Sequence, residues 1–343
     1  MRKMFRNDYC ELAHERILKA LLNAKEEQNV GYGLDTHSEN ARRLIKEVFK
    51  LDNPEIQFLA GGTQANMTVI SYLLRPYEAV ISCDTGHINV HETGAVEGSG
   101  NKIVIVPNKN GKVTAEEVEK VMKLHHDEHM VKIKMVYISN STEIGTIYYK
   151  DELLKLREIC DKYNLYLFLD GARLGSALTS SVNDVTPELI GKVCDAFYIG
   201  GTKNGTLYGE AVVLNNKEIF NDFRYHIKNK GAMLSKGFSL GIQYEELFKD
   251  GLFFEIGHHE NKMADLIKEE LIRLNVDFIK DAPTNQIFLD VNNEIAHNLI
   301  NEYGCELWEE KESSTVVRIV TSFNTKVEAV NELLADLRKW IKN

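Results

Sequence analysis

The chain has 343 residues, of which 43% are hydrophobic and 27% are charged, and this composition excludes a disordered, collagen-like or disulfide-scaffold protein. The net charge is −10 and we find no local basic patch, so we expect no nucleic-acid partner. No apolar run approaches the roughly 18 residues of a membrane span, and the charged N-terminus lacks the apolar segment of a signal peptide. Five scattered cysteines without a C-x-x-C pair indicate structural thiols in a reducing, cytoplasmic compartment.

Between residues 55 and 215, short β-rich runs alternate with segments of helical period. The predicted strands are 56–59, 79–82, 103–106, 135–139, 166–169, 196–199 and 211–214, and the predicted helices are 64–74, 115–124, 150–163 and 187–193. Strands that alternate with helices indicate βαβ units and a mostly parallel sheet. Because runs such as 165–169 are apolar on successive residues, we expect these strands to be buried on both faces.

The pattern changes after about residue 215. Residues 234–274 are largely helical with a break near Asp250 and Gly251, and they are followed by strands at 278–279, 286–289 and 316–321 and by helices at 293–303 and 326–341. We therefore predict an N-terminal arm and helix at 1–27, a large α/β domain at 28–245 and a smaller α+β domain at 246–343. In the large domain, helices would sandwich a mostly parallel, seven-stranded sheet.

Ligands of open α/β folds bind at the carboxyl ends of the strands, so the residues that follow each strand are candidate site residues. Gly62 and Thr63 follow the first strand, where a helix N-terminus capped by Thr63 would bind a phosphate, although a simple glycine turn is the alternative. Asp170 ends the strand 166–169, where a carboxylate calls for a cation such as a protonated pyridine nitrogen. A helix N-cap is the alternative role for Asp170.

Two further strands end at a lysine and a histidine. Lys203, flanked by glycines, could form a Schiff base with a cofactor, although a solvated loop lysine is the alternative. His87 could stack on an aromatic cofactor or carry protons. His87, His91 and Glu92 are spaced like a metal triplet, but the flanking glycines argue against the helix that a metal site needs, and we expect no metal. Together the four strand ends meet the requirements of pyridoxal 5′-phosphate.

The chain resembles the pyridoxal-phosphate-dependent threonine aldolases and related β-eliminating lyases of the aspartate-aminotransferase-like superfamily. The resemblance covers nearly the whole chain, and its most specific elements are Gly62-Thr63-Gln64-Ala65-Asn66 and Asp170-Gly171-Ala172-Arg173. The other matching segments, in the same order as in the family, are 5–9, 31–33, 86–87 with 92–94, 201–203 and 318–321.

The resemblance implies a role for each matching residue. Lys203 would bind the cofactor covalently, Asp170 would pair with the pyridine nitrogen, His87 would stack on the ring, and Gly62 and Thr63 would bind the phosphate. Arg173 and Arg318 would hold the substrate α-carboxylate, since a guanidinium is a two-pronged donor, although Arg318 could instead be a surface strand residue. Because the family is oligomeric, Tyr32 would enter the site of a neighbouring subunit in a homodimer or homotetramer.

Two positions depart from the family pattern. Glu143 takes the place of a histidine that lies near the substrate hydroxyl in typical threonine aldolases, and a carboxylate could still accept the hydroxyl proton with a different pH dependence. A leucine, Leu234, replaces the arginine with which a second subunit completes the phosphate site, and Lys236, Lys230 or Lys228 would substitute as a point charge.

The implied activity is a retro-aldol cleavage of β-hydroxy-α-amino acids, such as L-threonine or L-allo-threonine, into glycine and an aldehyde. Glu143, His87 or a water would take the hydroxyl proton. β-Elimination to a keto acid and ammonia is the alternative that the Glu143 departure favours, and transamination is a weaker one. A nucleotide-binding protein is a rival from another class, but no G-x-G-x-x-G opens the first helix and no Walker lysine follows Gly62. A non-catalytic cofactor-binding protein also stays open.

Overall fold

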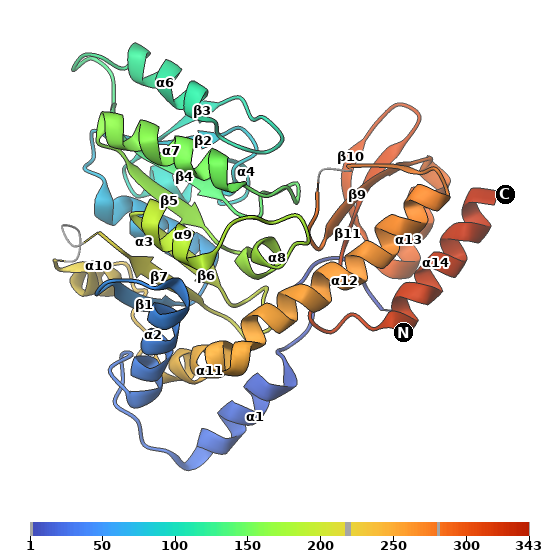
Figure 1. Ribbon diagram of the computed structural model, residues 1–343, viewed down its shortest axis with the longest axis horizontal. Coiled ribbons are helices and arrows are strands. Elements are labelled where there is room, and N and C mark those ends of the chain that lie inside the picture. The colour runs from blue at the N-terminus through green and yellow to red at the C-terminus, as the bar shows by residue number, and fades with distance from the viewer. Residues whose placement is uncertain (1–2, 217–220, 280–281, 343) are drawn as a thin grey trace.

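The computed structural model describes residues 3–216, 221–279 and 282–342. Figure 1 shows a large sheet wrapped by helices, a smaller sheet with its own helices beside it, and the long helix α12 (Leu252–Arg273) running between the two. This arrangement confirms the predicted fold class, an α/β body with a smaller α+β part toward the C-terminus. Within the described ranges, no helix is both long and apolar enough to cross a membrane.

The large sheet contains seven strands in the order β1-β7-β6-β5-β4-β2-β3. In chain order they are β1 (Glu55–Leu59), β2 (Glu78–Cys83), β3 (Lys102–Val106), β4 (Lys132–Ser139), β5 (Tyr166–Asp170), β6 (Ala196–Gly200) and β7 (Glu210–Leu214). β7 runs antiparallel to both β1 and β6, and the other neighbouring pairs are parallel. All the strands predicted between residues 55 and 215 are therefore confirmed, as is the mostly parallel sheet.

Helices cover both faces of this sheet (Figure 1). They are α2 (Thr36–Phe49), α3 (Gly62–Leu73), α4 (His87–Val90), α5 (Ala95–Gly98), α6 (Ala115–Leu124), α7 (Lys150–Tyr163), α8 (Leu174–Leu178), α9 (Pro187–Val193), α10 (Phe223–Asn229) and α11 (Phe238–Phe248). Several begin at side chains that accept a hydrogen bond from the first turn, such as Asp35 before α2 and Thr114 before α6. The cap of α6 explains why this helix starts at residue 115, as the sequence predicts, whereas α2 was not predicted.

Alternate residues along each strand enter the two separate hydrophobic cores on either side of the sheet. Val136 and Leu167 point into one core, whereas Tyr137 and Phe168 point into the other. Burying each such side chain contributes roughly 1.5–3 kcal/mol of stability. Because both faces of the strands are buried, polar groups at the strand ends are held in fixed positions at the carboxyl edge of the sheet.

The smaller sheet is antiparallel, in the order β10-β11-β9-β8. Its strands are β8 (Asp277–Phe278), β9 (Gln286–Val291), β10 (Glu306–Glu310) and β11 (Thr315–Val320), and its own helices are α13 (Asn293–Tyr303) and α14 (Val327–Lys342). The sequence did not predict β10, because three of its five residues are glutamates and it forms an exposed edge. The predicted break near Asp250 is confirmed, since Asp250 and Gly251 have positive φ between α11 and α12.

The N-terminal arm joins the two sheets. The Phe5 N–H donates to the Tyr303 carbonyl, and the Val320 N–H donates to the Phe5 carbonyl, so the arm is bonded to the smaller sheet and its helix. The arm then crosses to α1 (Glu15–Asn23), which packs on α11. Residues 6–14 therefore lie along the carboxyl edge of the large sheet, where Asp8 pairs with Arg173 and the His14 N–H donates to the Gly205 carbonyl.

Candidate active site

A pocket of about 320 Å³ opens at the carboxyl edge of the large sheet. Most of the residues that the sequence predicts for the site line it, namely Gly62, Thr63, His87, Glu143, Asp170, Arg173 and Lys203. These residues follow β1, β2, β4, β5 and β6, so the structure brings together the strand ends that the sequence singled out.

Asp170 ends β5 as a buried carboxylate in this pocket. It accepts four hydrogen bonds, from the Tyr137 hydroxyl at 2.6 Å, the Tyr198 hydroxyl at 2.5 Å, the Asn66 amide at 3.0 Å and the Ala172 N–H at 3.0 Å. Burial alone would raise the pKa of Asp170, but the charge of His87 and these hydrogen bonds outweigh burial, so the pKa lies below its usual value. All four donors are neutral, and the carboxylate keeps its negative charge.

Lys203 lies in a tight loop between β6 and β7. Gly201 is required in this loop, because a Cβ there would come within 2.7 Å of the Tyr244 hydroxyl. The Lys203 Nζ lies 5.8 Å from the centre of the Tyr9 ring, and both side chains line the pocket. Burial and the charge of Arg173 lower the pKa of Lys203, although the nearby carboxylates act in the opposite direction. A lowered pKa favours the neutral amine, which is the form that attacks a carbonyl carbon.

The glycine loop after β1 leads directly into α3. The N-cap is Gly61, which has no side chain to cap the helix, and Thr63 lies in the first turn, so the prediction of Thr63 as N-cap was wrong. The Gln64 side chain accepts a hydrogen bond from the Ala60 N–H at 3.0 Å and fixes the turn in place of a cap. Because Gly61, Gly62 and Thr63 line the pocket, the N-terminus of α3 offers backbone donors to an anion there.

His87 is held by a buried carboxylate. Its Nδ1 lies 2.7 Å from Oε1 of Glu92, and the Asn66 amide donates to the same oxygen at 2.7 Å. Asn66 also donates to Asp170, so one amide links the histidine–glutamate pair to the carboxylate at the end of β5. This contact through Nδ1 fixes the ring orientation and turns the rest of the imidazole toward the pocket.

Glu143 follows β4 and contacts the same histidine residue. Its Oε1 accepts hydrogen bonds from the Ser139 hydroxyl at 2.7 Å and from the His87 N–H at 3.1 Å. Burial raises the pKa of Glu143, and the charge of Asp170 adds to this effect while the Ser139 hydrogen bond opposes it. A carboxylate of raised pKa is a stronger proton acceptor than that of an ordinary glutamate, so Glu143 is suited to taking up a proton in this pocket.

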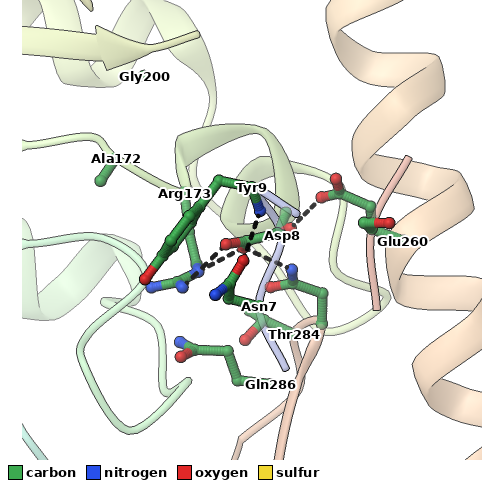
Figure 2. A network of polar contacts seen from close by, with 12 residues as sticks. Asn7, Asp8, Tyr9, Ala172, Arg173, Gly200, Glu260, Thr284 and Gln286 are labelled. Atoms are coloured by element: carbon green, nitrogen blue, oxygen red, sulfur yellow. Dashed lines mark hydrogen bonds and ion pairs between the residues drawn. The ribbon is translucent and has the colours of Figure 1, made fainter. Parts of the chain in front are cut away.

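Arg173 forms a buried ion pair with Asp8 of the N-terminal arm (Figure 2). Nε lies 2.6 Å from Oδ2 of Asp8, Nη2 lies 3.0 Å from Oδ1, and the Asn285 amide donates to Oδ2 at 2.9 Å. Burial would raise the pKa of Asp8, but the charge of Arg173 and the hydrogen bonds hold it below its usual value. The bidentate pair fixes the plane of the guanidinium at the pocket wall.

Three predicted site residues lie outside the pocket of this single chain. Arg318 on β11 pairs with Glu306 of β10, and its guanidinium carbon lies 5.4 Å from the centre of the Trp308 ring. Tyr32 is 44% exposed in a separate surface hollow, where the Lys228 Nζ lies 5.0 Å from the centre of its ring. Lys236 is exposed shortly before α11.

The sequence reasoning missed several residues that build the pocket. Asp8 and Tyr9 come from the arm, and Glu210 is the first residue of β7. Tyr137 and Tyr198 gave a usable signal, because a phenol in a strand buried on both faces needs a hydrogen-bond partner. A carboxylate such as Glu210 at the start of an apolar strand is a second signal of the same kind.

The chemistry of these side chains fits pyridoxal 5′-phosphate. Asp170 is a buried charged carboxylate that meets only neutral hydrogen-bond donors among those described above, which suits a protonated pyridine nitrogen. Lys203 supplies an amine of lowered pKa in the same pocket, and the uncapped N-terminus of α3 suits a phosphate.

Known proteins share both the sequence and the fold. Residues 5–294 match the family model described as beta-eliminating lyase. A low specificity L-threonine aldolase from Pseudomonas sp. (strain NCIMB 10558) is 31% identical, with 92% of each chain covered, and one from Pseudomonas aeruginosa is 29% identical, with 93% of this chain and 92% of the relative covered. A solved threonine aldolase from Leishmania major is 40% identical, with a TM-score of 0.97 and 99% of each chain covered.

More distant structures share the fold alone. An aspartate aminotransferase from Thermus thermophilus is 14% identical, with a TM-score of 0.71 over 98% of this chain and 92% of that one. The family model and the 31% identical relative cover most of the chain, and the pocket carries the side chains that the cofactor requires. This chain therefore belongs to the β-eliminating lyase family of pyridoxal 5′-phosphate-dependent enzymes, among the threonine aldolases.

Proposed function

We propose that this protein is an aldehyde-lyase of low specificity that cleaves L-threonine and L-allo-threonine into glycine and acetaldehyde. The observation that carries the proposal is one pocket in which a charged, buried Asp170 and a Lys203 of lowered pKa lie beside the open N-terminus of α3. The chain's similarity to threonine aldolases from Pseudomonas and Leishmania supports the choice of substrate.

The cofactor would be held by the residues that the sequence singled out. Asp170 would keep the pyridine nitrogen protonated, Lys203 would bind the cofactor covalently, His87 would lie against its ring, and the N–H groups of Gly62 and Thr63 would hold its phosphate. When bound, the cofactor supplies an electron sink for the electron pair that a breaking Cα–Cβ bond leaves on Cα.

The protein's own side chains orient the substrate and move one proton. Arg173, fixed by Asp8, would bind the substrate carboxylate together with Arg318. Glu143 and His87 lie side by side at the pocket, and either could accept the β-hydroxyl proton directly or through a water. Removal of that proton would allow the hydroxyl carbon to leave as an aldehyde.

A second candidate function follows from the same Glu143. Because burial raises the pKa of Glu143, a larger fraction of this carboxyl carries a proton than in an ordinary glutamate. A protonated carboxyl could donate its proton to a departing β-substituent, which would give β-elimination to a keto acid and ammonia.

We further propose that the enzyme is a cytoplasmic homodimer or homotetramer with its active sites at subunit interfaces. Tyr32 supports this, since the sequence resemblance assigns it to a neighbouring subunit's site and its side chain is 44% exposed, outside the pocket of its own chain. In a neighbouring subunit's site, Tyr32 would contact substrate and Lys236 would supply positive charge for the phosphate. The five free thiols among the described residues support a reducing compartment.

Borohydride reduction tests the proposed covalent role of Lys203. We expect reduction of the cofactor-loaded protein to fix the cofactor on the peptide that contains Lys203, and Lys203→Ala to lose both this adduct and the cleavage of threonine. A Lys236→Ala control should keep the reducible adduct on Lys203. An adduct that persists in Lys203→Ala would show that another lysine binds the cofactor.

A further inference from the structure

Glu210 is a buried carboxyl that the proposed reaction does not yet use. It begins β7, where it is paired with Gly200 of β6 on one side and with Leu59 of β1 on the other. This register places it between the loop that carries Lys203 and the glycine loop before α3. It lines the same pocket as Lys203 and is only 4% exposed.

Both carboxyl oxygens of Glu210 are tied to the residues just before Lys203. Oε1 accepts a hydrogen bond from the Thr202 hydroxyl at 3.0 Å, and Oε2 accepts one from the Gly201 N–H at 3.2 Å. Neither donor is charged. Glu210 is therefore held beside the lysine loop. Because its two donors are neutral, any positive charge that stabilises its carboxylate must come from another group of the pocket.

Glu210 interacts electrostatically with four titratable groups. Lys203 and Asp170 of β5 shift the pKa of Glu210, and Glu210 raises the pKa of Tyr198 of β6 and of Tyr244 of α11. The two phenols are already committed, because the Tyr198 hydroxyl donates to Asp170 and the Tyr244 hydroxyl contacts the Ile199 and Gly209 carbonyls. Lys203 is thus the cation of this set, and it shares the pocket with Glu210.

The surroundings favour the uncharged forms of both Lys203 and Glu210. Burial raises the pKa of Glu210 to about 8, with Thr202 and Lys203 opposing the shift and Asp170 adding to it. Burial also lowers the pKa of Lys203. A poorly hydrated pocket disfavours two separate charges more than an amine beside a carboxylic acid.

We propose that Glu210 is a positioning residue that keeps the proton on Lys203: its carboxylate stabilises the ammonium, and the two side chains titrate as a pair. The Glu210 carboxylate opposes the burial and the Arg173 charge, both of which favour the neutral amine of Lys203. When Glu210 is protonated this opposition is lost, and the amine, with the lone pair that attacks a carbonyl carbon, is favoured. The inference rests on the proposed role of Lys203.

The titration of Lys203 tests this pairing without any turnover. The full-length protein, freed of its cofactor, is acetylated with acetic anhydride between pH 6 and pH 11, and modification of Lys203 is followed by mass spectrometry. In the wild type we expect a curve broader than a single ionisation, because two groups titrate together. In Glu210→Gln we expect a single ionisation with a lower midpoint and labelling at pH 9 that is about three- to tenfold faster, since a one-unit shift changes the neutral fraction tenfold.

Two further variants make the result specific. Glu55→Gln removes a glutamate from the far end of the β1–β7 pair, opposite Leu214, and should leave the Lys203 curve as in the wild type. Thr202→Val removes a donor that favours the charged form of Glu210, so it should also speed the labelling of Lys203 at pH 9. This variant replaces Glu210→Gln as the test if Glu210→Gln does not fold.

Coincident curves for the wild type and Glu210→Gln, or for the wild type and Thr202→Val, would overturn the proposal. Failure of the proposed function shows differently, as a borohydride-reducible adduct that persists in Lys203→Ala.

Discussion

Neighbouring carboxyl groups in this pocket have pKa values that are shifted in opposite directions. Asp170 is held charged by hydrogen bonds and by His87, whereas burial raises the pKa of Glu143 and of Glu210. Such a separation of pKa values assigns roles, because the group of low pKa provides a fixed charge and the groups of raised pKa are the ones suited to taking up a proton. The sequence could predict Asp170 from its place at a strand end, but not these shifts, which depend on burial and on distant donors such as Asn66 and Tyr198.

The proposed role of Glu143 predicts a specific pH dependence. If Glu143 takes the hydroxyl proton, activity needs its deprotonated form and is lost as pH falls through its pKa, which lies above that of an ordinary glutamate. Glu143→Gln should lower kcat for threonine by about 10²–10⁴-fold and remove this acid limb from the kcat–pH profile. Glu97→Gln, an exposed change on α5, should alter neither. An unchanged profile in Glu143→Gln would assign the proton transfer to His87 or a water.

At the scale of secondary structure, local patterns predicted the large sheet well and the arm and edges poorly. The strands that carry the pocket are continuous apolar runs with glycine or polar residues at their ends, and that pattern is local. β10 was not predicted because its three glutamates are typical of a solvent-exposed loop, whereas here they lie on an exposed edge strand. The Asp8–Arg173 pair joins residues 165 positions apart, and no local pattern predicts such a contact. Most of the pocket residues could therefore be predicted from local patterns, whereas the contribution of the arm through Asp8 and Tyr9 could not.

The arm's ion pair makes a testable contribution to stability and binding. Asp8→Asn leaves the Arg173 charge buried and unpaired, so it should reduce the free energy of unfolding by about 3–5 kcal/mol and raise KM for threonine more than it lowers kcat. The folded-state pKa of Asp8 is lowered, so its contribution is present above the usual carboxyl pKa and is lost as pH falls through the lowered value.

Urea unfolding at several pH values measures this contribution. The difference between the wild type and Asp8→Asn should shrink only in strong acid. Asp290→Asn breaks a partly exposed pair with Lys311 and should cost about 0–1 kcal/mol. Equal losses in the two variants would contradict the assignment of Asp8 as the residue that holds Arg173.

For the whole molecule, the predicted division at residues 27/28 and 245/246 stays a prediction, as does the oligomeric state. Tyr32 and Lys236 lie away from the pocket of their own chain, and the sequence resemblance assigns both to the site of a neighbouring subunit, so their roles stay predictions about a second copy. The mainly apolar hollow beside Tyr32 includes the exposed Tyr225 and lies on the surface of the chain. In the proposed assembly, this hollow would form part of the subunit contact.

Subunit complementation tests that assembly. Lys203→Ala and Tyr32→Ala should each be strongly impaired alone, because one lacks the cofactor-binding lysine and the other lacks the residue donated to a neighbour. After mixing and subunit exchange, a mixed oligomer regains a site with both residues intact, so activity for threonine should return to about a quarter of the wild type by random pairing of subunits. Mixtures that remain as inactive as their components would show that Tyr32 does not act across subunits.

The most direct test of the central claim is the stoichiometry of the products. The purified protein with pyridoxal 5′-phosphate is incubated with L-threonine and, separately, with L-allo-threonine, and glycine, acetaldehyde, keto acid and ammonia are quantified. We expect glycine and acetaldehyde in equal amounts from both substrates. Keto acid with ammonia would contradict this expectation and would assign the protein to the β-eliminating branch of its family, and no turnover of either amino acid would contradict the proposed substrates.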